Sequence, residues 1–340
     1  MKICIFGAGA IGGHLAGRLA STGAELSIIA RGANLAAIQR NGLTVQTPSE
    51  TLRARPFATD DPAKIGPQDA VIITAKAPAL PAIAATIAPL LGPETHVTFV
   101  MNGIPWWYFH GHGGKRDGHA LDILDPGQTI RRAIDPARAI GAVIYSACTV
   151  ITPGTIQVDH AVSRLVLGEP DGRLTERVAR LASLLNSDGL RTEASPSIRN
   201  WIWNKLLMNL ATGPFSVLTQ SAPKDAFAEP ALRDAAMTIY AEAGAIAAAL
   251  GVTAGVDVGR QMHLSQSMTH KPSILQDLES ARPMEIDAIY AAPLALARLT
   301  GTATPTLDLL VALATIRARA AGLHPPGIAA NAMRHASASS

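Results

Sequence analysis

The sequence predicts an α/β protein in which an N-terminal doubly wound parallel sheet precedes an all-α C-terminal part. The first observation is local: an apolar run, Lys2–Phe6, leads through a glycine-rich turn into a helical pattern and a second apolar run. Together these make a β-α-β unit. The second observation is that strand and helix patterns alternate up to Pro196, after which strand patterns nearly vanish. We therefore expect a Rossmann-type domain at 1–195 and a helical domain for substrate binding and dimerisation at 196–335.

The turn after the first strand has the spacing G-x-G-x-x-G. Gly7 permits the tight turn, Gly9 lets a pyrophosphate approach the backbone, and Gly12 lets helix and strand pack closely. The helix that follows offers free N–H groups and a positive dipole end to phosphates. The predicted cofactor-binding residues of this turn are Gly7, Ala8, Gly9, Ala10, Ile11 and Gly12.

The end of the second strand predicts which dinucleotide binds. An NAD site usually has an acidic residue there for the ribose 2′-hydroxyl, but here Ala30 and Arg31 end the strand and Glu25 lies before it. A guanidinium is a planar fork of donors that stays charged, which suits a 2′-phosphate. Arg31 therefore predicts NADP(H); the alternative is a solvated surface charge.

The remaining elements follow from apolar runs and helical spacing. The expected strands lie at 43–46, 52–56, 70–74, 96–100, 140–146, 164–167 and 190–193, with a Pro153–Gly154 turn. The expected helices lie at 33–40, 79–91, 174–185, 198–210, 229–250, 273–300 and 306–321. Residues 106–132 fit no element and contain Trp106, Trp107, Tyr108 and Phe109. A segment of that length is often functional, and the alternative is a packed Ω-loop that holds the two domains together.

Composition narrows the class of protein. The 340 residues are 48% hydrophobic with a net charge of +3 and scattered basic residues, so we expect a globular protein with no nucleic-acid stripe. Cys4 and Cys148 form no disulfide framework; Cys4 is expected to be a buried apolar filler. No apolar run has transmembrane length and no convincing signal peptide is present. We expect a cytoplasmic protein with a frayed tail at 334–340.

Polar residues follow two of the predicted strands. Lys76 comes directly after the strand at 70–74, and Asn102 follows the strand at 96–100. Both should therefore lie at the carboxyl edge of the sheet, where ligands bind in such folds. The alternatives are a solvated loop charge for Lys76 and a turn residue for Asn102, because Asn-Gly is a common turn pair.

Four residues of the C-terminal half could carry chemistry. Lys205 and Asn209 share one helical face at i, i+4 spacing, and apolar surroundings can lower a lysine pKa so that it donates a proton near neutrality. The alternative is a snorkelling lysine. Ser273 alone predicts an N-cap with Gln276 completing a capping box, and Glu285 alone predicts an exposed helical charge. The histidines show no ligand spacing, so we expect no metal.

In combination these residues resemble the ketopantoate reductase (2-dehydropantoate 2-reductase) family over nearly the whole chain. The matching features are the glycine turn with Arg31, Lys76, Asn102-Gly103, the Trp-x-Lys-Leu-x-x-Asn pattern at 203–209, the run Ser273–Asp277 with Glu285, and Thr304–Thr306. The resemblance implies NADPH-dependent reduction of a 2-oxo acid to pantoate on the route to coenzyme A.

The resemblance also implies a role for each matching residue. Lys205 would be the general acid, Glu285 would orient the lysine or the cofactor end of the site, and Ser273 and Asn209 would hold the substrate's carboxylate and hydroxyl. Asn102 and Lys76 would contact nicotinamide ribose and substrate, and Ala147 would line the cofactor.

Two departures from the family pattern leave alternatives for the function. The family often has a second Asn one turn after Asn209, where this chain has Gly213, and the segment 106–132 resembles an insertion. Both suggest a reductase or dehydrogenase of another, bulkier 2-oxo or 2-hydroxy acid. A third hypothesis is an NADP-sensing protein without turnover, although Lys205, Ser273 and Glu285 are all present.

Overall fold

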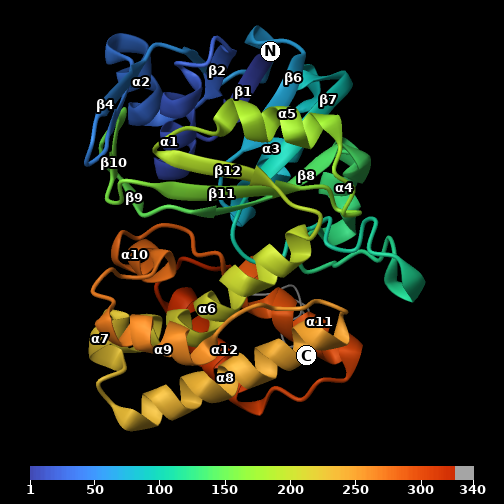
Figure 1. The fold of residues 1–340 in the computed structure, drawn as a ribbon, viewed down its shortest axis with the longest axis vertical. Helices are drawn as coiled ribbons and strands as arrows, with labels where there is room; N and C mark the ends of the chain where they lie inside the picture. The colour runs from blue at the N-terminus through green and yellow to red at the C-terminus, as the bar shows by residue number, and fades with distance from the viewer. Residues whose placement is uncertain (326–340) are drawn as a thin grey trace, which may run out of the picture. The chain divides into compact units, whose positions relative to one another are not determined.

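The computed structural model describes residues 1–325, which form two compact units (Figure 1). Unit 1 comprises Met1–Ile202 and unit 2 begins at Trp203. The division falls inside one long helix, α6 (Ile198–Thr219).

Unit 1 is built on an eight-stranded sheet in the order β12-β11-β8-β7-β6-β1-β2-β5. Neighbouring strands are parallel except β8 and β11, which are antiparallel. The predicted doubly wound sheet is therefore confirmed. Its strands are β1 (Lys2–Phe6), β2 (Glu25–Ile29), β5 (Phe57–Thr59), β6 (Gln68–Ile73), β7 (Leu91–Val100), β8 (Ala139–Tyr145), β11 (Ser163–Gly168) and β12 (Leu190–Ala194). Glu25 begins β2 rather than preceding it, at the end of the strand away from Arg31.

A second sheet of four strands, in the order β4-β3-β10-β9, packs against α1. A Cβ at Gly13 would lie 2.6 Å from Ile156, and one at Gly17 would lie 2.7 Å from Val45, so both glycines let this sheet approach the helix. The strands predicted at 43–46 and 52–56 are confirmed as β3 and β4, which pair antiparallel, but the Pro153–Gly154 turn joins two strands that the sequence analysis missed. The four strands are β3 (Leu43–Gln46), β4 (Thr51–Ala54), β9 (Cys148–Thr152) and β10 (Thr155–Val158).

Helices cover both faces of the large sheet, with α1 beside α5 on one face and α3 beside α4 on the other (Figure 1). The helix predicted at 79–91 is wrong: a five-residue helix lies between two 3₁₀ turns, Ala77–Ala79 and Ala88–Leu90. Pro89 lacks the N–H that a continuous helix would need, whereas Pro81 lies in the first turn of the helix, where proline is tolerated. The helices of unit 1 are α1 (Ala10–Leu19), α2 (Gly32–Asn41), α3 (Leu80–Ala84), α4 (Thr129–Ala133) and α5 (Glu176–Leu185).

All regular elements of unit 2 up to residue 325 are helical. The single helix predicted at 273–300 is wrong, because the chain turns at Ala281, which has φ 49°, and Pro283 follows. A π-helical turn, η7 (Asp287–Ala291), then leads into α11. Helix α9 was not predicted. The α-helices besides α6 are α7 (Pro223–Ala226), α8 (Pro230–Ala249), α9 (Val258–Ser267), α10 (Ser273–Glu279), α11 (Ala292–Thr300) and α12 (Pro305–Ala320).

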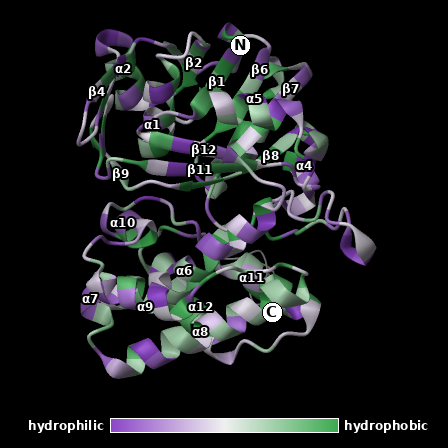
Figure 2. Ribbon diagram, viewed as in Figure 1, coloured by the Kyte–Doolittle hydropathy of each residue, from purple (hydrophilic) through white to green (hydrophobic). Residues whose placement is uncertain are grey.

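The core of unit 1 lies in its central strands, where Ile3, Cys4, Ile5 and Ile72 have no exposed surface. Figure 2 shows hydrophobic residues concentrated in the strands of this sheet. The predicted burial of Cys4 is confirmed, and burial raises the pKa of its thiol to about 12. No helix among residues 1–325 is long and apolar enough to cross a membrane. The tail predicted at 334–340 lies outside the described residues.

The aromatic segment packs inside unit 1. Residues Trp106–Phe109 are at most 5% exposed, and the Trp107 ring would lie 2.7 Å from a Cβ at Gly141 of β8. The Arg199 guanidinium donates to the carbonyl oxygens of Tyr108 (2.7 and 2.9 Å) and His110 (2.8 Å). Trp106–Phe109 are therefore part of the core of unit 1, while the role of the whole segment 106–132 stays a prediction.

Candidate active site

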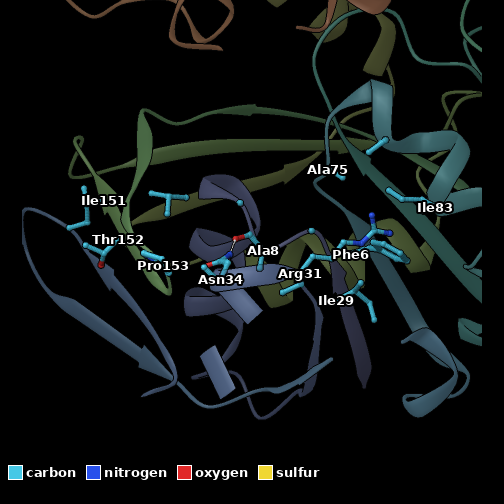
Figure 3. Close-up of a pocket in the computed structure, with 16 residues that line it drawn as sticks. Phe6, Ala8, Ile29, Arg31, Asn34, Ala75, Ile83, Ile151, Thr152 and Pro153 are labelled. Atoms are coloured by element: carbon cyan, nitrogen blue, oxygen red, sulfur yellow. Dashed lines mark hydrogen bonds between the residues drawn. The ribbon is translucent and has the colours of Figure 1, made fainter. Parts of the chain in front are cut away.

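A cavity of about 610 Å³ opens in unit 1 around the turn that follows β1. Figure 3 shows Ile151, Thr152 and Pro153 on one side of it and Ala75 and Ile83 on the other. Segments from four places in the chain therefore form its walls. The lining residues are Phe6–Gly9, Ile29–Arg31, Ala33, Asn34, Ala75, Ala79, Ile83 and Val150–Pro153.

The three glycines of the turn meet three different demands. A Cβ at Gly12 would collide with the Gly7 carbonyl oxygen and with Thr74 Oγ1, which donates a 2.5 Å hydrogen bond to that carbonyl. Gly7 has φ 113° and would bring a Cβ within 2.9 Å of the Ala75 backbone. A Cβ at Gly9 would meet no atom within 4 Å, so the backbone there is open. The turn thus fits a pyrophosphate at the α1 N-terminus.

Arg31 and Asn34 lie where β2 passes into α2. Arg31 is the exposed N-cap residue of α2, and its guanidinium makes no ion pair with any residue in the described range. Asn34 Nδ2 donates to the Ala8 carbonyl (Figure 3), and Asn34 Oδ1 accepts from the Gly154 N–H at 2.7 Å. Asn34 therefore fastens the glycine turn to the β9–β10 hairpin. The sequence analysis missed this role.

Apolar side chains line the cavity near Arg31. Ile29 and Ile83 come from the large sheet's side, while Val150 and Ile151, 40% and 49% exposed, come from the hairpin. An apolar slot beside a guanidinium suits a flat base that carries a phosphorylated ribose. The hairpin was not predicted as part of the site, because only a turn was recognised there.

The remaining candidates of unit 1 lie outside this lining. Lys76 follows β6 as the half-buried N-cap of a 3₁₀ turn, and Asn102 follows β7, the parallel neighbour of β6. Both occupy the predicted carboxyl edge of the sheet. Ala147 lies between β8 and β9, and its carbonyl accepts from the Asp159 N–H at 2.9 Å. Their contacts with a ligand stay predictions.

The sequence analysis also missed a polar cluster around the buried His14 of α1. His14 Nδ1 lies 3.2 Å from Ser146 Oγ, and Ser163 Oγ donates to Ser146 Oγ at 2.9 Å. Burial, with the nearby Arg18 cation, lowers the pKa of His14 to about 4, so this imidazole is neutral at physiological pH. Among residues 1–325, no three His, Cys, Asp or Glu side chains are grouped to hold a metal ion.

In unit 2, Lys205 and Asn209 occupy successive turns of α6 and are both half-buried. One turn later, a Cβ at Gly213 would collide with the Tyr290 hydroxyl and lie 3.4 Å from Ile274 Cγ2. Gly213 is therefore where α6, α10 and η7 converge. Since Ser273 begins α10 and Glu285 lies just before η7, the structure brings the predicted elements of the C-terminal site together.

Two predictions about these elements are wrong. Ser273 is the first residue of α10 and exposed, Pro272 occupies the N-cap position, and no side chain caps the helix. Gln276 instead donates to the Lys271 carbonyl at 2.8 Å. Pro272, with its fixed φ, starts this helix without a side-chain cap.

Glu285 is only 5% exposed, so the exposed helical charge predicted from its position alone is also wrong. The turn before it is held by the Arg282–Asp277 ion pair at 3.0 Å, with Asp277 itself buried. A buried carboxylate is retained only where partners compensate its desolvation, so the burial of the Glu285 carboxylate is a specific feature of this fold.

The glycine cradle, the cavity and the helical unit with a lysine and a buried carboxylate together define a nicotinamide-dependent oxidoreductase. The family description Ketopantoate reductase PanE/ApbA matches residues 3–172, and Ketopantoate reductase PanE/ApbA C terminal matches residues 197–318. The chain belongs to the ketopantoate reductase family, which confirms the resemblance.

Individual relatives match nearly the whole chain. A 2-dehydropantoate 2-reductase of Mesorhizobium japonicum is 45% identical over 315 residues, covering 92% of this chain and 96% of its own. A solved structure from Ralstonia solanacearum MolK2, assigned as a ketopantoate reductase, is 38% identical with a TM-score of 0.88, covering 94% and 98%. D-Mandelate dehydrogenase, solved with NADH and anilino(oxo)acetate, is 22% identical with a TM-score of 0.78 over 95% and 100%, and shares the fold.

Proposed function

We propose that this protein reduces 2-dehydropantoate (ketopantoate) to pantoate with NADPH. The observation that carries the proposal is the 45% identity, over 92% of the chain, to a 2-dehydropantoate 2-reductase. The clash that any side chain at Gly12 would produce supports it, because the turn is shaped for a dinucleotide.

The proposal that the cofactor is NADP(H) rests on Arg31. Its guanidinium borders the cavity, and the acidic Glu25 stands at the opposite end of β2. The turn residues Gly7–Gly12 would hold the pyrophosphate, with Lys76, Asn102, Ala147 and Glu285 toward the nicotinamide end. The domain at 1–195 would thus bind cofactor, and 196–335 would contribute the substrate side.

When bound, the reduced nicotinamide supplies a hydride to the 2-oxo carbon. The carbonyl oxygen then needs one proton to become the 2-hydroxyl, and Lys205 Nζ would donate it. Glu285 would orient the lysine, because its carboxylate is buried in unit 2, in the segment that leads into η7. Asn209, Ser273 and Asn102 would bind the substrate's carboxylate and hydroxyl.

We further propose a cytoplasmic homodimer. Leu309, Leu313 and Ile316 form an apolar stripe on α12 and are 61%, 42% and 61% exposed. Spacing of four and three residues puts them on one face, where a second copy would cover them.

The test is formation of pantoate from ketopantoate and NADPH, identified by mass spectrometry. We expect Lys205→Ala to lower kcat by about 10²- to 10⁴-fold, the usual worth of general acid catalysis, with NADPH affinity unchanged. Lys224→Ala, on the exposed face of α7, is the matched control. Unchanged kcat in Lys205→Ala would refute the proton-donor role, and absence of pantoate with the unaltered protein would refute the function.

A further inference from the structure

The hydroxyl of Tyr290 is buried without a hydrogen-bond partner. The side chain has no exposed surface, and no residue of the described chain accepts from or donates to the hydroxyl. Leaving such a group unpaired is unfavourable, so a fold retains it where a ligand or water supplies the partner. Burial raises the pKa of Tyr290, so the hydroxyl remains a proton donor.

This hydroxyl lies where a side chain at Gly213 would be. The Cβ of any larger residue at 213 would collide with Tyr290 Oη, while Tyr290 Cζ would be 3.5 Å away. Gly213 thus makes room for one atom, the phenolic oxygen. The tyrosine sits in the π-helical turn η7, a rare geometry that is frequent at functional sites.

The position along α6 indicates which part of a substrate the hydroxyl would meet. With a rise of about 1.5 Å per residue, Gly213 lies roughly 6 Å beyond Asn209 and roughly 12 Å beyond Lys205. The polar groups therefore follow one another in the order Lys205, Asn209, Tyr290. If Lys205 serves the reacting carbonyl, Tyr290 serves the end of the substrate remote from it.

We propose that Tyr290 is a specificity-determining residue whose hydroxyl, which fills the space that Gly213 leaves, binds the hydroxyl group at the remote end of a hydroxylated 2-oxo acid. This inference rests on the proposed function, because ketopantoate carries such a hydroxyl on the carbon farthest from its carboxylate.

The test compares two substrates that differ by that one oxygen, ketopantoate and 3,3-dimethyl-2-oxobutanoate, at saturating NADPH. We expect Tyr290→Phe to lower kcat/KM for ketopantoate by about 5- to 15-fold, as for loss of one hydrogen bond, and to leave 3,3-dimethyl-2-oxobutanoate within about twofold. Tyr240→Phe is the matched control, because it removes another buried, unpartnered hydroxyl from α8, and we expect no change with either substrate.

Gly213→Ala gives a second, independent perturbation, since its methyl group displaces the phenolic oxygen. We expect the same selective loss with ketopantoate, and no additional loss when it is combined with Tyr290→Phe. Equal losses with both substrates, or no loss with either, would overturn the inference while the reductase activity of the unaltered protein stood. If the unaltered protein reduces neither substrate, the proposed function fails and the inference with it.

Discussion

Adding one methyl group at Gly213 should have opposite effects on stability depending on whether the Tyr290 oxygen is present. Gly213 lies inside α6 directly before Pro214, where alanine is favoured over glycine by at most about 1 kcal/mol, because the proline ring crowds the Cβ of the residue before it. In the unaltered protein the methyl group would collide with Tyr290 Oη, and overpacking of a core costs about 1–3 kcal/mol. Gly213→Ala alone should therefore lower the free energy of unfolding by about 1 kcal/mol.

Removing the oxygen removes the collision. In the Tyr290→Phe background the nearest atoms to the new methyl group are Ile274 Cγ2 at 3.4 Å and the ring carbon at 3.5 Å, both ordinary contacts. The same Gly213→Ala change should then raise stability by about 0.5–1 kcal/mol, which gives a coupling of about 2 kcal/mol. Urea unfolding of the four proteins at constant m measures this coupling. Effects that add to within about 0.5 kcal/mol would refute the reasoning.

Three further predictions concern unit 1. Arg31→Asp should weaken NADPH binding by about 10- to 100-fold, as for loss of one charged hydrogen bond, and leave NADH binding nearly unchanged. Arg40→Asp, at the far end of α2, should change the affinity for neither cofactor, as measured by fluorescence titration. Equal losses of affinity for both cofactors in Arg31→Asp would exclude a 2′-phosphate contact. Gly12→Ala should destabilise the fold by about 1–3 kcal/mol. Gly9→Ala, whose new Cβ would meet no atom within 4 Å, should keep the melting temperature of the unaltered protein and weaken cofactor binding only. Similar melting temperatures for the two variants would contradict the geometry described for the glycine turn. The folded-state pKa of His14 is about 4 and the unfolded-state value is near 6.5, so the unfolded protein binds more protons between these two pH values. The free energy of unfolding should therefore fall by on the order of 3 kcal/mol as the pH drops from 6.5 to 4. His14→Gln should lose less stability over the same range, and an identical pH profile of the variant would show that His14 is not responsible.

Local patterns in the sequence predicted much of the fold. The first strand, the glycine turn and α1 lie within about twenty consecutive residues, so period and turn chemistry were sufficient. The single helix predicted at 79–91 is wrong because the prediction followed the apolar spacing and did not take account of Pro89, which a continuous helix would place in its interior. The break after α10 was missed for a similar reason: the positive φ of Ala281 has no signal of its own, but Pro283, two residues later, signals the end of a helix.

The candidate site residues likewise could be predicted only where a local sequence pattern marks them. The open backbone at Gly9 and the place of Arg31 at the end of β2 could be predicted, because the glycine motif and the strand that follows it are local patterns. Asn34 could not, since its hydrogen bonds reach Ala8 and Gly154, and a tertiary contact has no local pattern. A matched small and large pair such as Gly213 and Tyr290 is likewise visible only once the helices are packed.

The most direct test of the central claim is the rate of NADPH oxidation with a panel of 2-oxo acids: ketopantoate, 3,3-dimethyl-2-oxobutanoate, phenylpyruvate and benzoylformate. If the protein is a ketopantoate reductase, kcat/KM should be highest for ketopantoate, by at least about tenfold over the aromatic acids. A kcat/KM for an aromatic acid that equals or exceeds that for ketopantoate would contradict the account.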